Sequence, residues 1–109
     1  MLENIFGSRN KERILIFLLA RKEGYAREIA KFYESSLSPI QNLLDKLEAG
    51  SVLSSRTVGK TRVYSFNPRY PFLKELNDLL EKAFQFIPKD EKEKLIVVRK
   101  RPRRKGKPI

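Results

Sequence analysis

The segment from Leu37 to Pro68 constrains the fold more than any other part of the chain. It reads LSPIQNLLDKLEAGSVLSSRTVGKTRVYSFNP, and its first third carries the local signals of a helix. Ser38 is a favoured N-cap, Pro39 suits the first helical position, and Gln41 completes an S-x-x-Q capping box. We therefore expect a helix at about 38–49. At about 100° per residue its apolar side chains share one side: Ile40, Leu43, Leu44 and Leu47.

Gly50 or Ser51 is expected to end this helix, and a β-hairpin is expected to follow it. Residues 52–58 and 62–67 alternate with a period of two and are rich in Val, Tyr and Phe, which is typical of strands. The letters GKT between them predict a three-residue hairpin turn that contains glycine. The segment is therefore a leucine-striped helix followed directly by a basic hairpin.

Three further helices are predicted from capping residues and apolar periodicity. The first is capped by Ser8 or Asn10, runs to about Arg21, and is apolar nearly all round, so it should be buried at the centre. The others lie at 26–34 and 72–87. The order helix, helix, helix, hairpin, helix predicts a mainly α fold with a small β-hairpin, an α+β winged helix-turn-helix.

Charge divides the chain into two parts. The 109 residues include 24 Lys and Arg against 13 Asp and Glu, a formal net charge of +11. From residue 89 onward there are ten basic and three acidic residues. We expect one winged-helix domain at 1–88, with its last helix at about 70–87, and a basic, flexible tail at 89–109. Such an excess predicts an anionic partner, with nucleic acid first and an acidic membrane surface second.

Composition also argues against several classes of function. The chain has no Cys and no His, so disulfides and thiolate metal sites are excluded and the commonest general base is missing. We expect no enzyme activity, no cofactor and no metal. The apolar run ILIFLLA is far shorter than the roughly 20 residues of a membrane span. No signal peptide is expected either, and a cytoplasmic, nucleoid-associated protein is the expected class.

The residues from Tyr25 to Pro68 carry a family resemblance. YAREIAKFYESSLSPIQNLLDKLEAGSVLSSRTVGKTRVYSFNP resembles the ArsR-like and MarR-like winged-helix transcriptional regulators of bacteria and archaea, and IFGSRNKERIL resembles their first helix. The resemblance covers about residues 5–87. Ser51 stands where these regulators usually have glycine, so the helix end is expected to shift by one residue. The Cys and His ligands of ArsR-type metal sensors are missing, so the resemblance implies no metal sensing.

The resemblance and the spacing together define candidate site residues. The helix at 38–49 is expected in the major groove of double-stranded DNA, with the hairpin at 52–67 on the backbone or in the minor groove. The expected DNA-binding residues are Ser36, Ser38, Pro39, Gln41, Asn42, Lys46, Arg56, Lys60, Thr61, Arg62, Arg99, Lys100, Arg101, Arg103 and Arg104. A homodimer is expected through the stripe of Phe72, Leu73, Leu76, Leu79, Leu80, Ala83 and Phe84.

Gln41 has two candidate roles, which compete for one side-chain amide. In the free protein it is expected to complete the cap, and in the complex to pair with N6 and N7 of adenine. Two alternatives to DNA binding stay open for the whole chain. One is a winged helix used for protein contact, as in toxin–antitoxin or nucleotidyltransferase-associated complexes. The other is RNA binding, with Tyr25, Tyr64 or Phe66 as stacking residues.

Overall fold

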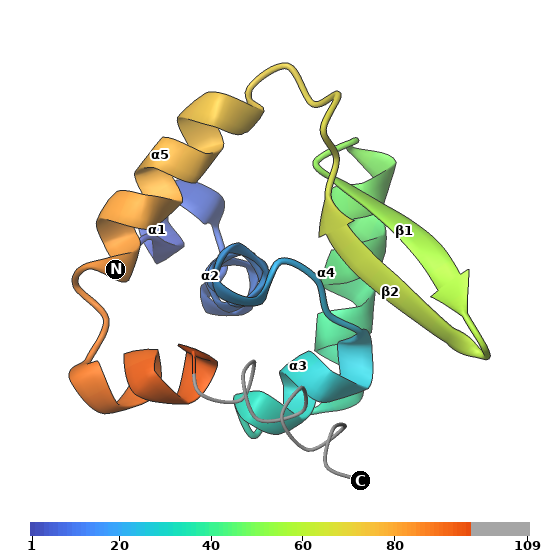
Figure 1. The fold of residues 1–109 in the computed structure, drawn as a ribbon, viewed down its shortest axis with the longest axis horizontal. Coiled ribbons are helices and arrows are strands. Elements are labelled where there is room, and N and C mark those ends of the chain that lie inside the picture. The colour runs from blue at the N-terminus through green and yellow to red at the C-terminus, as the bar shows by residue number, and fades with distance from the viewer. Residues whose placement is uncertain (97–109) are drawn as a thin grey trace, which may run out of the picture.

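The computed structural model describes residues 1–96 and has the predicted α+β class (Figure 1). Residues 89–96 are also helical. The predicted order of helix, helix, helix, hairpin, helix is confirmed by α2 to α5 and the hairpin, so the fold is a winged helix-turn-helix. The elements are α1 Glu3–Phe6, α2 Arg9–Arg21, α3 Ala26–Phe32, α4 Leu37–Ala49, β1 Leu53–Val58, β2 Thr61–Phe66 and α5 Leu73–Phe84.

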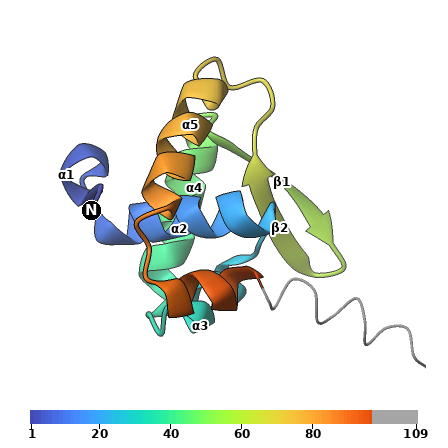
Figure 2. The ribbon, with the colours of Figure 1, turned by 60° about the vertical axis from the view of Figure 1, so that its left-hand side comes forward.

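Helix α2 lies at the centre of the molecule. Ser8 caps it as predicted, because its Oγ accepts a hydrogen bond from the Lys11 backbone N–H at 3.1 Å. The five consecutive residues 14–18 are all buried, which requires neighbours on every side of the helix. Figures 1 and 2 show these neighbours, with α3, α4 and α5 arranged around α2.

The short helix α1 was not anticipated from the sequence. Gly7 ends it with a φ of 82°, a left-handed conformation that favours glycine. The turn buries Leu2, and the Leu2 backbone N–H donates to Glu12 Oε1 at 3.0 Å. Glu12 is a buried charged residue of α2, so this hydrogen bond ties the N-terminal segment to the central helix.

The hairpin pairs β1 and β2 antiparallel, in a register from Leu53 opposite Phe66 to Val58 opposite Thr61. Its turn is therefore the two residues Gly59 and Lys60, and the predicted three-residue turn is wrong. Gly59 has a φ of 65°, as expected for the glycine at the first central position of a type II′ turn. This turn type twists with the strands, so Thr61 can pair as the first residue of β2 instead of belonging to the loop.

The second edge of β2 is held by the backbone between α2 and α3. The Gly24 N–H donates to the Tyr64 carbonyl at 3.0 Å, and the Tyr64 N–H donates back at 2.8 Å. A Cβ added to Gly24 would approach the Phe17 ring to 2.8 Å, so only glycine fits at this contact. The hairpin is therefore attached to the helical body through main-chain hydrogen bonds.

Residues 89–96 form a helix in the segment that we expected to begin a flexible tail. Leu95 is buried in the same core as α2. The Arg21 guanidinium reaches the end of this helix, where Nε donates to the Leu95 carbonyl at 3.1 Å and Nη2 to the Lys94 carbonyl at 3.3 Å. The same group lies 4.6 Å from the Phe17 ring centroid and 3.5 Å from Glu28. The packed region thus extends to at least residue 96, eight residues beyond Pro88.

Candidate functional site

Helix α4 starts earlier than its sequence signals suggest. Its first residue is Leu37, and Ser36 is the N-cap residue with extended backbone angles. The reason lies in the preceding turn, where Glu34 has a φ of 55° and the Ser35 N–H returns to the Ala30 carbonyl at 2.8 Å. Ser38 therefore lies inside the first turn of α4, and its predicted role as N-cap is wrong.

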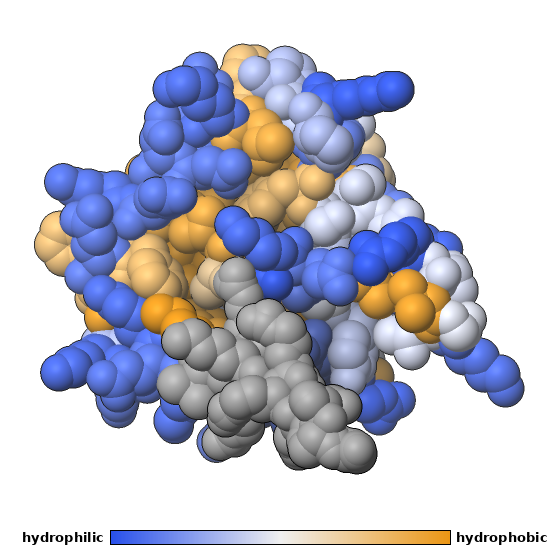
Figure 3. Space-filling model, in the orientation of Figure 1, coloured by the Kyte–Doolittle hydropathy of each residue, from blue (hydrophilic) through white to orange (hydrophobic). Residues whose placement is uncertain are grey.

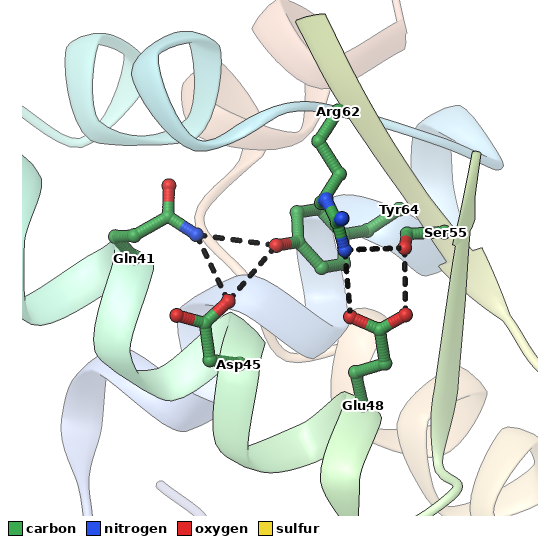
Figure 4. A network of polar contacts seen from close by, with 6 residues as sticks. All are labelled: Gln41, Asp45, Glu48, Ser55, Arg62 and Tyr64. Carbon is green, nitrogen blue, oxygen red and sulfur yellow. Dashed lines mark hydrogen bonds and ion pairs between the residues drawn. The ribbon is translucent and has the colours of Figure 1, made fainter. Parts of the chain in front are cut away.

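The Gln41 side chain does not close a capping box, because it is bonded to other partners. Its Nε2 donates to Asp45 Oδ1 and to the Tyr64 hydroxyl, both at 3.1 Å. The Tyr64 hydroxyl in turn donates to Asp45 Oδ1 at 3.1 Å. Burial raises the pKa of Tyr64, and the nearby Asp45 carboxylate raises it further, so the hydroxyl stays protonated as a donor. These three side chains join α4 to β2 (Figure 4).

A second polar cluster lies one turn further along α4. Glu48 Oε2 accepts from Ser55 Oγ at 2.6 Å, and Glu48 Oε1 lies 3.5 Å from Arg62 Nη1. Arg62 also donates to Ser55 Oγ at 3.3 Å. The period of two along each strand explains the geometry, since Arg62 and Tyr64 lie on the same face of β2 and Ser55 lies opposite Tyr64 on β1. That face of the hairpin rests on α4 (Figure 4).

An open groove of about 380 Å³ runs between α3, α4 and the hairpin. Three cationic side chains line it, namely Arg27 from the first turn of α3 with Lys60 and Arg62 from the hairpin. Sequence analysis proposed the last two and missed Arg27. Helical periodicity in AREIAKF could have found it, because the buried residues Ala26, Ile29 and Ala30 leave Arg27 on the exposed side. The groove can hold an anionic group.

The other candidate residues divide into exposed, engaged and undescribed groups. Arg56 pairs with Glu23 at 2.9 Å across the far side of the hairpin, on a surface where both side chains are about half exposed. Thr61 is half-buried at the start of β2. The basic residues Arg99, Lys100, Arg101, Arg103 and Arg104 lie outside the described residues. The fully exposed members of the α4 set are Ser36, Ser38, Pro39, Asn42 and Lys46.

The apolar stripe of α5 is divided between the core and the surface. Leu80 and Ala83 are buried in the chain's own core, so these two predicted interface residues cannot contact a partner. The reason is that α5 packs this side of the stripe against α2 (Figure 2). Phe72 is 61% exposed. The remaining members of the stripe are partly buried: Leu73, Leu76, Leu79 and Phe84. Exposed apolar side chains lie along and beside α5 on the face in Figure 3.

Two other kinds of site were searched for in residues 1–96. No helix in this part of the chain is long and apolar enough to cross a membrane. No group of three or more His, Cys, Asp or Glu side chains in the same residues is placed to hold a metal ion.

Comparison with known proteins places the fold. No family model and no curated protein matches the sequence. Among solved structures, a double mutant of ZitR from Lactococcus lactis in its apo form is similar, with a TM-score of 0.55 and 15% identity over 97% of this chain and 89% of that one. The adhesin competence repressor AdcR from Streptococcus pyogenes is similar, with a TM-score of 0.51 and 14% identity over 97% and 92%. At these identities the likeness establishes the winged helix-turn-helix fold.

Proposed function

We propose that this chain is a transcriptional regulator that binds double-stranded DNA sequence-specifically, with α4 in the major groove and the hairpin on the backbone or in the minor groove. The observation that carries the proposal is the groove of Arg27, Lys60 and Arg62 beside the exposed polar face of α4. A helix fits the major groove, and neighbouring cations can then hold the phosphates on either side of it. AdcR, a repressor by name, shares the fold, which supports a regulatory role.

Several features favour DNA over the alternatives. The Tyr64 ring is 1% exposed and so cannot stack on an RNA base without unfolding β2. The net charge of +11 favours a polyanion over an ordinary protein surface. No catalytic function is proposed, and action on chromosomal DNA implies a cytoplasmic, nucleoid-associated location. The lack of His and Cys in the sequence supports a regulator that works without a metal.

We also propose that the chain binds DNA as a homodimer. Two-fold dimers are the commonest oligomers, and a dimer presents two helices to half-sites about one helical turn apart. The outer side of α5 supports this, because Phe72 is exposed while Leu76 and Leu79 are only partly covered by the core. The interface proposed here is Phe72, Leu73, Leu76, Leu79 and Phe84.

The test is selection from a random duplex pool, followed by mobility shifts with the selected duplex, a scrambled duplex, single-stranded DNA and duplex RNA. We expect one enriched motif and preferential binding of its duplex. Lys60→Ser should weaken binding to both duplexes by a similar factor, since a phosphate contact carries no sequence information. Lys82→Ser, a change of equal charge at an exposed site on α5, is the matched control and should bind normally. Equal affinity for all four nucleic acids, or no enriched motif, would reject the proposal.

A further inference from the structure

The side-chain amide of Gln41 has only one orientation that fits its neighbours. A carboxylate can only accept hydrogen bonds, so the amide nitrogen must face Asp45 Oδ1, 3.1 Å away. The second hydrogen on this nitrogen is directed at the Tyr64 hydroxyl, also at 3.1 Å. That hydroxyl can accept it because its own proton goes to Asp45. Both donors of the Gln41 amide are therefore used inside the protein.

The atoms left over on this part of α4 are acceptors. Gln41 Oε1 and Asp45 Oδ2 form no hydrogen bond with any of residues 1–96. Figure 4 shows both oxygens directed away from the bonded triangle of Gln41, Asp45 and Tyr64. The two residues are four positions apart, so they lie on the same side of the helix. Asp45 is exposed and Gln41 is half-buried, which leaves both accessible from outside.

We infer that Gln41 and Asp45 together form an acceptor-only reading surface, which pairs with the exocyclic amines of bases in the major groove. These amines are N4 of cytosine and N6 of adenine. The inference rests on the proposed DNA binding and deepens it. It also replaces the two-atom contact of Gln41 with adenine, because that contact needs an amide N–H for the adenine N7.

The surface should keep this character in a complex. Turning the amide would break two hydrogen bonds at once, and Tyr64 cannot follow it, since its backbone is paired with Gly24 on both sides. A carboxylate is also repelled by phosphates, so Asp45 is better placed at a base edge than at the backbone. The cationic groove of Arg27, Lys60 and Arg62 lies beside Gln41 and supplies the phosphate contacts.

The test uses the unmodified full chain and its selected duplex. The relevant base pair is the one whose preference is relaxed by Gln41→Ala or Asp45→Ala. At this position an analogue without the amine, purine for adenine or 2-pyrimidinone for cytosine, should lower affinity by ~5- to 150-fold, the range for one good base contact. If the base is adenine, 7-deazaadenine keeps the amine and lacks N7, so it should bind as well as adenine.

Variants at Tyr64 and Tyr70 provide a second, independent readout. Tyr64→Phe releases one amide hydrogen of Gln41, so preference at the same base pair should relax at least several-fold. Tyr70→Phe removes a hydroxyl outside the network and should keep the preference. Thermal unfolding of both variants shows whether each one is folded under the binding conditions.

The outcomes separate the inference from the proposed function. A selected motif in which 7-deazaadenine costs as much as loss of the amine would overturn the acceptor-only surface and leave DNA binding intact. The same holds if neither Gln41 nor Asp45 affects any base preference, or if Tyr64→Phe is folded and leaves the preference unchanged. Failure to select any motif would overturn the proposed function, and this inference with it.

Discussion

Ser51 occupies a backbone conformation that suits glycine far better than serine. Helix α4 ends in a Schellman motif, because the Val52 N–H returns to the Leu47 carbonyl at 3.0 Å and the Ser51 N–H to the Glu48 carbonyl at 2.9 Å. The motif requires a left-handed residue between them, and Ser51 supplies it with a φ of 69°. We predict that Ser51→Gly stabilises the domain.

The size of the effect follows from two opposing terms. A side chain in the left-handed region costs about 1–2 kcal/mol. Glycine gives back roughly 0.5–1 kcal/mol, because its unfolded chain has more conformations to lose. The Asn67 side chain donates to the Ser51 carbonyl at 3.0 Å, and this main-chain contact survives the substitution. The expected net gain is therefore about 0.5–1 kcal/mol, or about 2–4 °C in Tm for a domain of this size.

The assay is thermal and urea unfolding of three variants in parallel with the unmodified chain. Ser51→Ala keeps a Cβ at the same φ and should show no such gain. Gly59→Ala is the reverse experiment, because Gly59 has a φ of 65° and no atom within 4 Å of an added Cβ. It should lose about 1 kcal/mol from backbone strain alone. A Ser51→Gly variant that is no more stable, or a Ser51→Ala variant that gains as much, would refute the reasoning.

Four further outcomes are expected. Arg21→Met should cost about 2–3 kcal/mol through two carbonyl hydrogen bonds and a cation–π contact, and should expose residues 89–96 to protease; unchanged cleavage would mean that Arg21 does not hold that helix. Phe72→Glu should give a folded monomer in sedimentation, and a dimer that persists would contradict the proposed interface. Removal of residues 97–109 takes away seven basic residues and should flatten the salt dependence of DNA affinity by about 0.9 per lost phosphate contact, with the selected site unchanged; a different site would contradict this. Tyr33→Phe should leave stability unchanged or raise it by up to about 1 kcal/mol, since the Tyr33 hydroxyl is buried without a partner among residues 1–96, and a clear loss in urea unfolding would show that the hydroxyl is bonded.

Local sequence signals were sufficient for the order of elements. The Ser8 cap, the apolar run in α2 and the alternation in the hairpin depend on neighbours in the chain, so they could be interpreted without a structure. The start of α4 could not, although its S-x-x-Q pattern is a strong one. The reversal at Glu34 sets that start, and Gln41 prefers partners from elsewhere in the fold.

The candidate site depended more on distant partners. Tyr64 is 23 residues from Gln41, and alternation alone placed it in the core without showing which side chain its hydroxyl would meet. Leu80 belongs to the same stripe as Phe72, and only the packing of α5 decides which of the two is buried. The helix at 89–96 was missed because its anchor, Arg21, lies 74 residues away from Leu95.

The pairing of Gly24 with Tyr64 also has an energetic consequence for any ligand of the hairpin. Binding normally costs free energy to immobilise loops and side chains at the interface. Here β2 is bonded to the body through its main chain on one edge and through the Tyr64 hydroxyl on α4. The hairpin is thus preorganised, so it has little conformational entropy left to lose, and it should dock together with α4 as one rigid surface.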